Sequence, residues 1–392
     1  MTDEAPLLTT AEVARLLGVK PATVYAYVSR GLLDSRRNAD GKNSLFDRRE
    51  VDAFLAGRKR PGTPGIQTGI TLIRDGRLHY RGHDVVALAH VAGFEEVVEL
   101  LWTGTRRHAA FLPDPALLHL ARAVTAPLPA TARHTDRLRV TVAAAAAGDP
   151  LRFDTSPGAV VATGRTLLGT MVAALPAARE SGRAKQIADM LWGRLTAWEP
   201  SPREHNLLNA ALILLADHDI AASTLAARVA ASTRAHPYAV VGAGLAALDG
   251  PLHGAASSLA HPLLAAVIDR PDPTDVIADR LRSGDPVPGF GHRLYPDGDP
   301  RAAALLEMLG DTRARDAAER LTDVMRARSG VRPNVDLALA ALTVEYGMPS
   351  DAGETIFAVA RTAGWIAHAL EEYADRPSRF RPSGEYAGRT PA

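Results

Sequence analysis

Four short segments concentrate histidine, arginine and aspartate within apolar sequence, and their residue types could do chemistry. The first is Gly-Pro-Leu-His-Gly at residues 250–254, which leads into an apolar helix. His253 is therefore expected at or just before a helix N-terminus, where the positive end of the helix disfavours imidazolium. An uncharged imidazole there can donate a hydrogen bond to a developing enolate oxygen, although a histidine that merely caps a turn would show the same pattern.

The second segment, residues 288–301, contains too much glycine and proline to form a helix. Such a loop lets the backbone approach a ligand closely. Its His292 and Arg301 suit one anionic ligand, because a guanidinium grips a carboxylate with two parallel hydrogen bonds. The alternative is a surface turn with scattered charges.

The third and fourth segments are expected to lie on helices. Asp336 follows Arg-Pro-Asn-Val and enters an apolar helix, where an aspartate is most often an ordinary N-terminal residue. Residues 360–368 place Arg361, Trp365 and His368 on one helical face. An arginine on such a face is expected to be buried, and it then requires either a partner aspartate or a bound substrate carboxylate.

One further histidine, His218, stands between two aspartates at residues 217–219. As a metal site this triplet is weak, because adjacent residues on a helix point in different directions. We predict no metal site in the chain.

The composition bounds the class of protein. The 392 residues allow one large core and an appended module, and 45 basic against 44 acidic residues give no reason to expect a polyanion partner for the whole chain. The absence of cysteine excludes disulfides, thiolate metal sites and a cysteine nucleophile. The chain shows no secretory signal pattern and no run of about 18 apolar residues, so we expect a cytoplasmic protein without membrane contact.

The elements that must position these residues are mainly helices. Beyond residue 65, alanine- and leucine-rich segments cut by proline and glycine predict an all-α body. One short hairpin is expected between residues 68 and 80, around Asp75-Gly76. Charge, proline and glycine oppose regular structure near residues 58–65, so we predict a linker at 61–67.

The N-terminal segment has a pattern of its own. Thr9 and Glu12 have the spacing of a capping box. From residue 15 to residue 60 there are 11 basic residues and five acidic ones, an excess that favours contact with DNA. The predicted elements are a helix that ends at residue 18, a second helix over 21–29, a wing over 32–37 and 44–46 that turns at Asp40-Gly41, and a third helix over 47–54.

Taken together, the four segments resemble the citrate synthase family. The shared motifs are Gly-Pro-Leu-His-Gly, Gly-Phe-Gly-His followed by Asp-Pro-Arg, Pro-Asn-Val-Asp and Ala-Arg-Thr-x-Gly-Trp-x-x-His, and the match runs in order from about residue 69 to the C-terminus. The resemblance implies a large helical domain at residues 68–254 and 348–392 and a small helical domain at 255–347. It implies an enzyme that condenses acetyl-CoA with oxaloacetate and water to citrate and CoA. No cofactor is implied, since the CoA thioester is a substrate.

The resemblance also assigns roles to residues. Asp336 would take a proton from the acyl-CoA α-carbon, His253 would stabilise the enol, and His292 would polarise the keto carbonyl of oxaloacetate. The contacts to the substrate carboxylates carry over to His218, Arg301, Arg361 and Arg381. In the family the last of these arginines reaches the site of the neighbouring subunit, which implies a homodimer.

The acyl chain remains open at this point. Propionyl-CoA would give 2-methylcitrate, and one methylene in a pocket is worth only about 1 to 3 kcal/mol. Pro296 stands where a basic residue near the CoA phosphates is frequent in the family, and Leu337 replaces a common aromatic residue. These departures leave the chemistry intact and the acyl preference undecided.

Residues 8–55 resemble the winged helix-turn-helix module of the MerR and excisionase type, and we assign residues 1–60 to this domain. The alternative is a helical appendage that serves dimer contacts or stability. A second functional class follows, a DNA-binding transcription regulator with a citrate-synthase-like body that senses a metabolite, but a sensor would need no base such as Asp336. The residues expected to contact DNA are Lys20, Thr23, Tyr25, Arg36, Arg37 and Lys42.

Overall fold

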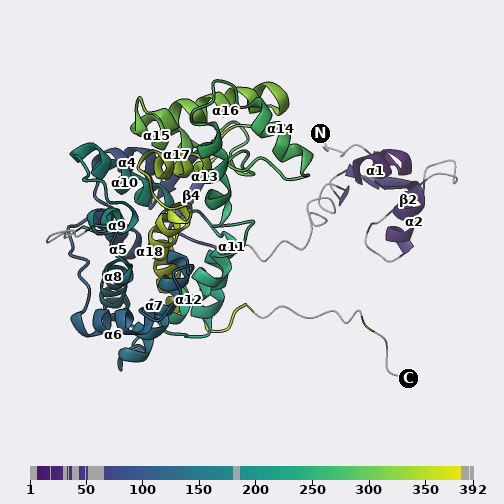
Figure 1. Ribbon diagram of the computed structural model, residues 1–392. Helices are drawn as coiled ribbons and strands as arrows, with labels where there is room; N and C mark the ends of the chain where they lie inside the picture. The colour runs from purple at the N-terminus through teal and green to yellow at the C-terminus, as the bar shows by residue number, and fades with distance from the viewer. Residues whose placement is uncertain are drawn as a thin grey trace. The chain divides into compact units, whose positions relative to one another are not determined.

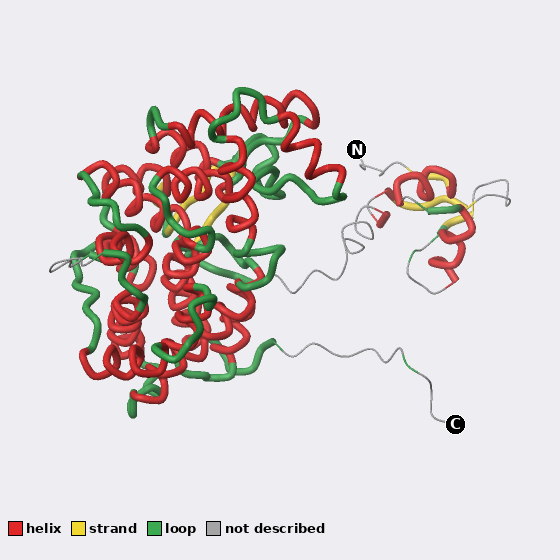
Figure 2. Tube along the Cα trace, in the orientation of Figure 1, coloured by secondary structure: helices red, strands yellow, loops and turns green. Residues whose placement is uncertain are grey.

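The computed structural model describes residues 7–17, 19–29, 33, 35–37, 44–48, 50–51, 66–179, 186–380 and 388. The chain divides into two compact units, residues 1–67 and 68–392. Helices dominate the larger unit, as Figure 2 shows, and its few strands gather in one small sheet. Within the described ranges no helix is both long enough and apolar enough to cross a membrane.

The N-terminal unit combines helices with a small sheet. Thr9 and Glu12 form the predicted capping box at the start of the first helix, because Glu12 Oε2 accepts a hydrogen bond from the Thr9 N–H over 2.8 Å while the Glu12 N–H donates to Thr9 Oγ1 over 3.4 Å. The predicted wing strands pair antiparallel, and a further strand that the sequence did not predict completes the sheet in the order β1-β3-β2. The elements are β1 (Leu7–Thr9), α1 (Thr10–Leu17), α2 (Pro21–Ser29), β2 (Arg36–Arg37) and β3 (Ser44–Asp47).

The core of this unit is small. Val13 of α1, Val24 of α2 and Phe46 of β3 are buried against one another, which ties both helices to the sheet. The turn expected at Asp40-Gly41 lies outside the described residues, as do residues 49 and 52–54 of the third predicted helix. Residues 48, 50 and 51 of that helix are helical.

The body opens with the predicted hairpin. Strands β4 (Thr71–Arg74) and β5 (Arg77–Tyr80) pair antiparallel around Asp75 and Gly76, whose φ values of 51° and 70° suit a tight hairpin turn. A third strand, β6 (His83–Asp84), pairs with β5. Two residues are too few to show a strand periodicity, which is why the sequence did not predict β6.

The rest of the body is helical, as predicted from its composition. Five of its helices begin with proline, whose fixed φ and missing N–H suit the first turn. The helices are α4 (Val85–Val91), α5 (Phe94–Thr103), α6 (Pro115–Thr125), α7 (His134–Gly148), α8 (Pro157–Ala174), α9 (Ile187–Leu195), α10 (Pro202–Leu215), α11 (Ala222–Ser232), α12 (Pro237–Leu248), α13 (Ala256–Val267), α14 (Thr274–Arg282), α15 (Pro300–Leu309), α16 (Arg313–Ser329), α17 (Val335–Glu345) and α18 (Ala352–Ala374).

Helix α18 is the axis around which much of the body packs (Figure 1). It lies against α5, α8, α10, α11 and α12 and is buried over most of its length. Two glycines permit its closest approaches. A Cβ on Gly244 would lie 2.4 Å from Trp365, and a Cβ on Gly364 would lie 2.4 Å from Asp217 Oδ1. The end of α10 is thereby held directly against α18.

A second group of helices packs around α17. Helices α13, α15 and α16 all contact it, and Figure 1 shows them gathered at one end of the body. These helices fall within residues 255–347, the range predicted for the small domain. The division into a large domain and a small domain at residues 255 and 347 stays a prediction.

Candidate active site

His253 lies in the loop between α12 and α13, as its sequence position indicated. Its Nε2 is 2.8 Å from Ser223 Oγ and accepts the Ser223 N–H over 3.4 Å. Because a backbone N–H can only donate, the ring proton is on Nδ1. Burial, followed by the positive charge of Arg361, lowers the pKa of His253 to about 4. The side chain is therefore an uncharged hydrogen-bond donor at neutral pH.

The loop that carries His292 is fastened to the start of α17. Asn334 caps this helix by accepting the Asp336 N–H on Oδ1 over 3.0 Å, and its Nδ2 donates to the Gly291 carbonyl over 3.0 Å. An antiparallel bridge between Phe290 and the residue before Asn334 adds to this connection. One asparagine thus sets the backbone next to His292 relative to the backbone of Asp336.

Asp299 organises the other side of Asp336. It caps α15 and binds the Arg301 guanidinium with both oxygens, Nε to Oδ1 at 3.0 Å and Nη2 to Oδ2 at 2.8 Å. Its Oδ2 also accepts the Val335 N–H over 3.1 Å. Burial raises the pKa of Asp336 to about 7, while the charge of Arg301 opposes the rise. A carboxyl group with this pKa is suited to act as a base near neutral pH.

The other two histidines predicted for the site, His218 and His292, both contact Tyr295. His218 Nε2 is 2.9 Å from Tyr295 Oη, and the rings of His218 and His292 stand edge to face with centroids 5.2 Å apart. His292 Nδ1 accepts the Leu294 N–H over 3.2 Å, so its ring proton is on Nε2. Burial, followed by the charge of Arg301, lowers the pKa of both histidines. His292 can therefore donate to a ligand without carrying a charge.

Arg361 is buried on α18, as the sequence predicted, with 1% of its surface exposed. Its Nε donates to the Leu215 carbonyl over 2.8 Å, and its Cζ lies 4.5 Å from the centroid of the Phe357 ring. Nη1 and Nη2 make no hydrogen bond to the part of the chain that the structure describes. Burial lowers the pKa of Arg361 to about 10, which still leaves a cation at neutral pH. Two charged donors therefore face no protein acceptor, the situation that binding of an anion would relieve.

Electrostatics link these side chains into one cluster. Arg301 acts on the pKa values of Asp336, His292 and His218, and Arg361 acts on those of His218 and His253. Six of the seven residues predicted for catalysis and substrate binding are thus brought together. The seventh, Arg381, lies outside the described residues.

The sequence did not single out three residues of the cluster, namely Ser223, Tyr295 and Asp299. Asp299 had a usable signal, since an aspartate followed by proline has the pattern of a helix N-cap with proline in the first turn. Ser223 and Tyr295 had none, because each meets its histidine across 30 and 77 residues of sequence.

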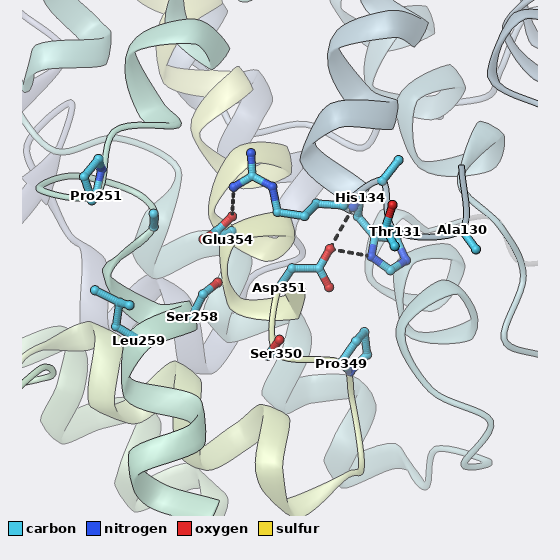
Figure 3. A pocket seen from close by; sticks show the side chains of 13 residues that line it. Ala130, Thr131, His134, Pro251, Ser258, Leu259, Pro349, Ser350, Asp351 and Glu354 are labelled. Atoms are coloured by element: carbon cyan, nitrogen blue, oxygen red, sulfur yellow. Dashed lines mark hydrogen bonds and ion pairs between the residues drawn. The ribbon is translucent and has the colours of Figure 1, made fainter. Parts of the chain in front are cut away.

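A different part of the body holds a cavity of about 460 Å³ (Figure 3). Its charged side chains pair with one another, since Asp351 accepts the His134 backbone N–H over 2.7 Å and Glu354 accepts from Arg133 over 3.4 Å. Pro251, two residues before His253, lies on its wall, but no residue predicted for catalysis or substrate binding lines it. Its acids and bases are already matched, so the cavity adds no free charge to the cluster described above.

The residues predicted to contact DNA are partly accessible on the N-terminal unit. Lys20 is exposed just before α2, Thr23 is half-buried, and 54% of Tyr25 is exposed. Arg36 and Arg37 form β2, and Arg36 is exposed. Lys42 lies outside the described residues.

Comparison with known proteins decides the family. Residues 60–383 match the family described as citrate synthase, C-terminal domain. The chain belongs to the citrate synthase family. Residues 7–59 match the family described as helix-turn-helix domain. Both resemblances inferred from the sequence are confirmed, and as a family member this chain is an acyltransferase.

Relatives within the citrate synthase family include enzymes of both acyl preferences. The chain is 31% identical to 2-methylcitrate synthase 2 of Corynebacterium glutamicum, over 79% of this chain and 88% of that protein. It is 30% identical to citrate synthase 2 of Bacillus subtilis, over 86% and 96% of the two chains. Among solved structures, the ternary complex of Thermoplasma acidophilum citrate synthase with carboxymethyl coenzyme A and oxaloacetate matches with a TM-score of 0.69 at 25% identity, over 84% and 96% of the two chains.

Proposed function

We propose that this citrate synthase family member condenses acetyl-CoA with oxaloacetate and water to give citrate and CoA, with Asp336 as the base. The observation that carries the proposal is the carboxyl group of Asp336, whose pKa of about 7 leaves it ready to accept a proton near neutral pH. An aspartate can deprotonate a thioester only if the enolate is held by preorganised donors. The Nδ1–H of His253 and the Nε2–H of His292 are such donors.

Each step of the proposed reaction can be assigned to a residue of the cluster. The Asp336 carboxylate takes a proton from the α-carbon of the thioester, and the Nδ1–H of His253 stabilises the enol oxygen. The enolate carbon attacks the keto carbon of oxaloacetate, which a hydrogen bond from the Nε2–H of His292 polarises as the carbon-carbon bond forms. The alkoxide that results is protonated as Asp336 gives up the proton it had taken, so the carboxylate is restored and His292 stays neutral. Water then cleaves the citryl thioester and releases CoA. The carboxylates of oxaloacetate bind to Arg361, Arg301 and His218, and the thioester is a substrate, so the reaction needs no cofactor.

The choice of acetyl over propionyl chain is the finer part of the proposal, since the relatives include 2-methylcitrate synthases. The test is release of free CoA, followed with a thiol reagent, with oxaloacetate and either acetyl-CoA or propionyl-CoA. We expect kcat/KM to favour acetyl-CoA and mass spectrometry to identify citrate. A higher kcat/KM with propionyl-CoA would make the enzyme a 2-methylcitrate synthase, and release with neither would refute the condensation.

A homodimer is part of the same proposal, because the family resemblance makes Arg381 complete the site of the neighbouring subunit. Mixing of two inactive variants, Arg381→Leu and Asp336→Ala, tests this. A mixed dimer would hold one site with both residues intact, so random reassociation should restore about a quarter of the wild-type activity. If the mixture stays inactive although mixed dimers have formed, Arg381 does not act across subunits.

DNA binding is a second candidate function, and it is favoured by the helix-turn-helix match and by the exposed Arg36 on the wing. We expect a salt-dependent mobility shift of promoter fragments. The double variant Arg36→Glu and Arg37→Glu should abolish the shift. A matched control reverses two exposed arginines of the body, Arg74 and Arg77. A shift that survives the wing variant, or is lost equally in the control, would refute the assignment.

A further inference from the structure

A chain of buried polar groups lies beside Arg361 and continues along α18. Its members are Asp217, His368, Arg228, Glu371 and Glu372. It starts at Asp217, which is fully buried directly after α10. Asp217 Oδ2 accepts the hydroxyl of Thr71 over 2.5 Å and lies 3.3 Å from His368 Nε2. Its other oxygen, Oδ1, makes no hydrogen bond within the described residues. The carboxylate is thus held by one oxygen only.

The far side of His368 fixes the position of its proton. His368 Nδ1 lies 2.5 Å from Nη1 of Arg228, and a guanidinium can only donate. Nδ1 is therefore the acceptor, the ring proton is on Nε2, and His368 donates to Asp217. Arg228 is held in turn by two carboxylates, those of Glu371 at 2.7 Å and of Glu372. The direction of donation along the chain is set by Arg228.

Asp217 and Arg361 are unsatisfied neighbours. Burial acts to raise the pKa of the Asp217 carboxyl, but the hydrogen bonds from His368 and Thr71 and the charge of Arg361 hold it below its usual value. Arg361 has two Nη atoms without a hydrogen bond and Asp217 has one oxygen without one, counted over the described residues. Gly364, packed against Asp217 Oδ1, supplies no donor to it from a side chain. In a buried setting a carboxylate and a guanidinium attract each other strongly, so something must keep them from pairing.

We infer that His368 and Asp217 are positioning residues for oxaloacetate: His368 and Thr71 hold the Asp217 carboxylate away from the Nη groups of Arg361, which stay available to a substrate carboxylate. The inference rests on the proposed function, in which Arg361 binds oxaloacetate. The charge of Asp217 still supports the buried cation without occupying its donors. The chain thereby acts on KM for oxaloacetate and leaves acyl-CoA binding alone.

The test compares two substitutions at His368. His368→Leu removes the donor, so Asp217 should turn to Arg361 and the KM for oxaloacetate should rise about 10-fold or more, as expected for loss of a hydrogen bond to a charged group. The KM for acyl-CoA should stay within about twofold of wild type. His368→Gln retains a donor toward Asp217 and an acceptor toward Arg228, so it should restore most of the oxaloacetate affinity.

A buried ion pair elsewhere in the body is the matched control. Glu99 of α5 is fully buried and pairs with Arg165 at 2.7 Å and Arg107 at 2.6 Å. Glu99→Gln should lower the thermal stability and leave the KM for oxaloacetate unchanged. If His368→Leu yields no folded protein, Thr71→Val removes the other donor to Asp217 and should raise the same KM by a smaller factor.

Three results would overturn the inference. They are an unchanged KM for oxaloacetate in His368→Leu, equal increases in the leucine and glutamine variants, and the same increase in the Glu99 control. Calorimetric titration of oxaloacetate into wild type and variants separates this question from the proposed function. Wild type that binds oxaloacetate but releases no CoA would refute the condensation, while the titration would still decide the role of His368.

Discussion

The two buried arginines of the active site lie in regions that accommodate a guanidinium in different ways. Between α15 and α17, Arg301 is bound by both oxygens of Asp299. Between α10 and α18, Nε is the only hydrogen-bond donor of Arg361 that finds an acceptor among the described residues, and Asp217 stands near the guanidinium without a hydrogen bond to it. A buried arginine that is already paired stabilises the fold and shifts the pKa values of its neighbours. A buried arginine without an ionic partner keeps its hydrogen-bond donors available for a ligand.

The largest expected effect is on stability, at Arg301. Arg301→Met leaves Asp299 buried and unpaired, which typically costs about 3 to 5 kcal/mol of unfolding free energy. Denaturant unfolding measures this loss. Arg361→Met removes a cation that has no ionic hydrogen bond, so its unfolding free energy should equal or exceed that of wild type. Equal losses in the two variants would remove the distinction between the two regions.

The next effect is on catalysis, at Arg361. Without the two free Nη donors, oxaloacetate loses a charge-assisted contact, and kcat/KM for oxaloacetate should fall about 10²-fold or more. Steady-state kinetics at saturating acetyl-CoA measure the fall. A kcat/KM within about threefold of wild type in a folded Arg361→Met variant would show that oxaloacetate does not bind to Arg361.

A third prediction concerns pH. Only the ionised Asp336 is a base, and its pKa is about 7, so kcat/KM should rise with pH below 7 and level off above about 8. His253, with a pKa of about 4, does not titrate in this range. Arg301 lowers the pKa of Asp336, so the midpoint should move to higher pH in Arg301→Met. A flat profile between about pH 5.5 and pH 8 would contradict the assignment.

The smallest expected effect is at Tyr295, which joins the two regions through His218. Tyr295→Phe removes one neutral hydrogen bond, worth about 0.5 to 1.5 kcal/mol, so the KM for oxaloacetate should rise about 2- to 13-fold. The stability should change little. A larger loss than in Arg361→Met would mean that His218, rather than the unpaired arginine, dominates substrate binding.

The same comparison shows how far sequence reasoning reached. The helical body and the hairpin near residue 75 could be predicted from local pattern, and the motifs predicted six residues that the structure places in one cluster. Burial of Arg361 followed from its helical face. That Asp299 pairs with Arg301 had a local signal in the N-cap pattern, but that Asp217 makes no hydrogen bond to Arg361 had none. Asp217 receives its hydrogen bonds from Thr71 of β4 and His368 of α18, which lie far from it in the sequence. The spacing of residues in the sequence therefore could not predict them.

The central claim is that the Asp336 carboxylate removes the α-proton of the acyl-CoA, and Asp336→Asn tests it most directly. The amide keeps the size and the cap of α17 but cannot accept the proton. With the folded variant matched to wild type by thermal unfolding, CoA release from acetyl-CoA and oxaloacetate should fall about 10²- to 10⁴-fold, while calorimetric binding of oxaloacetate is retained. CoA release at the wild-type rate in Asp336→Asn would contradict the mechanism.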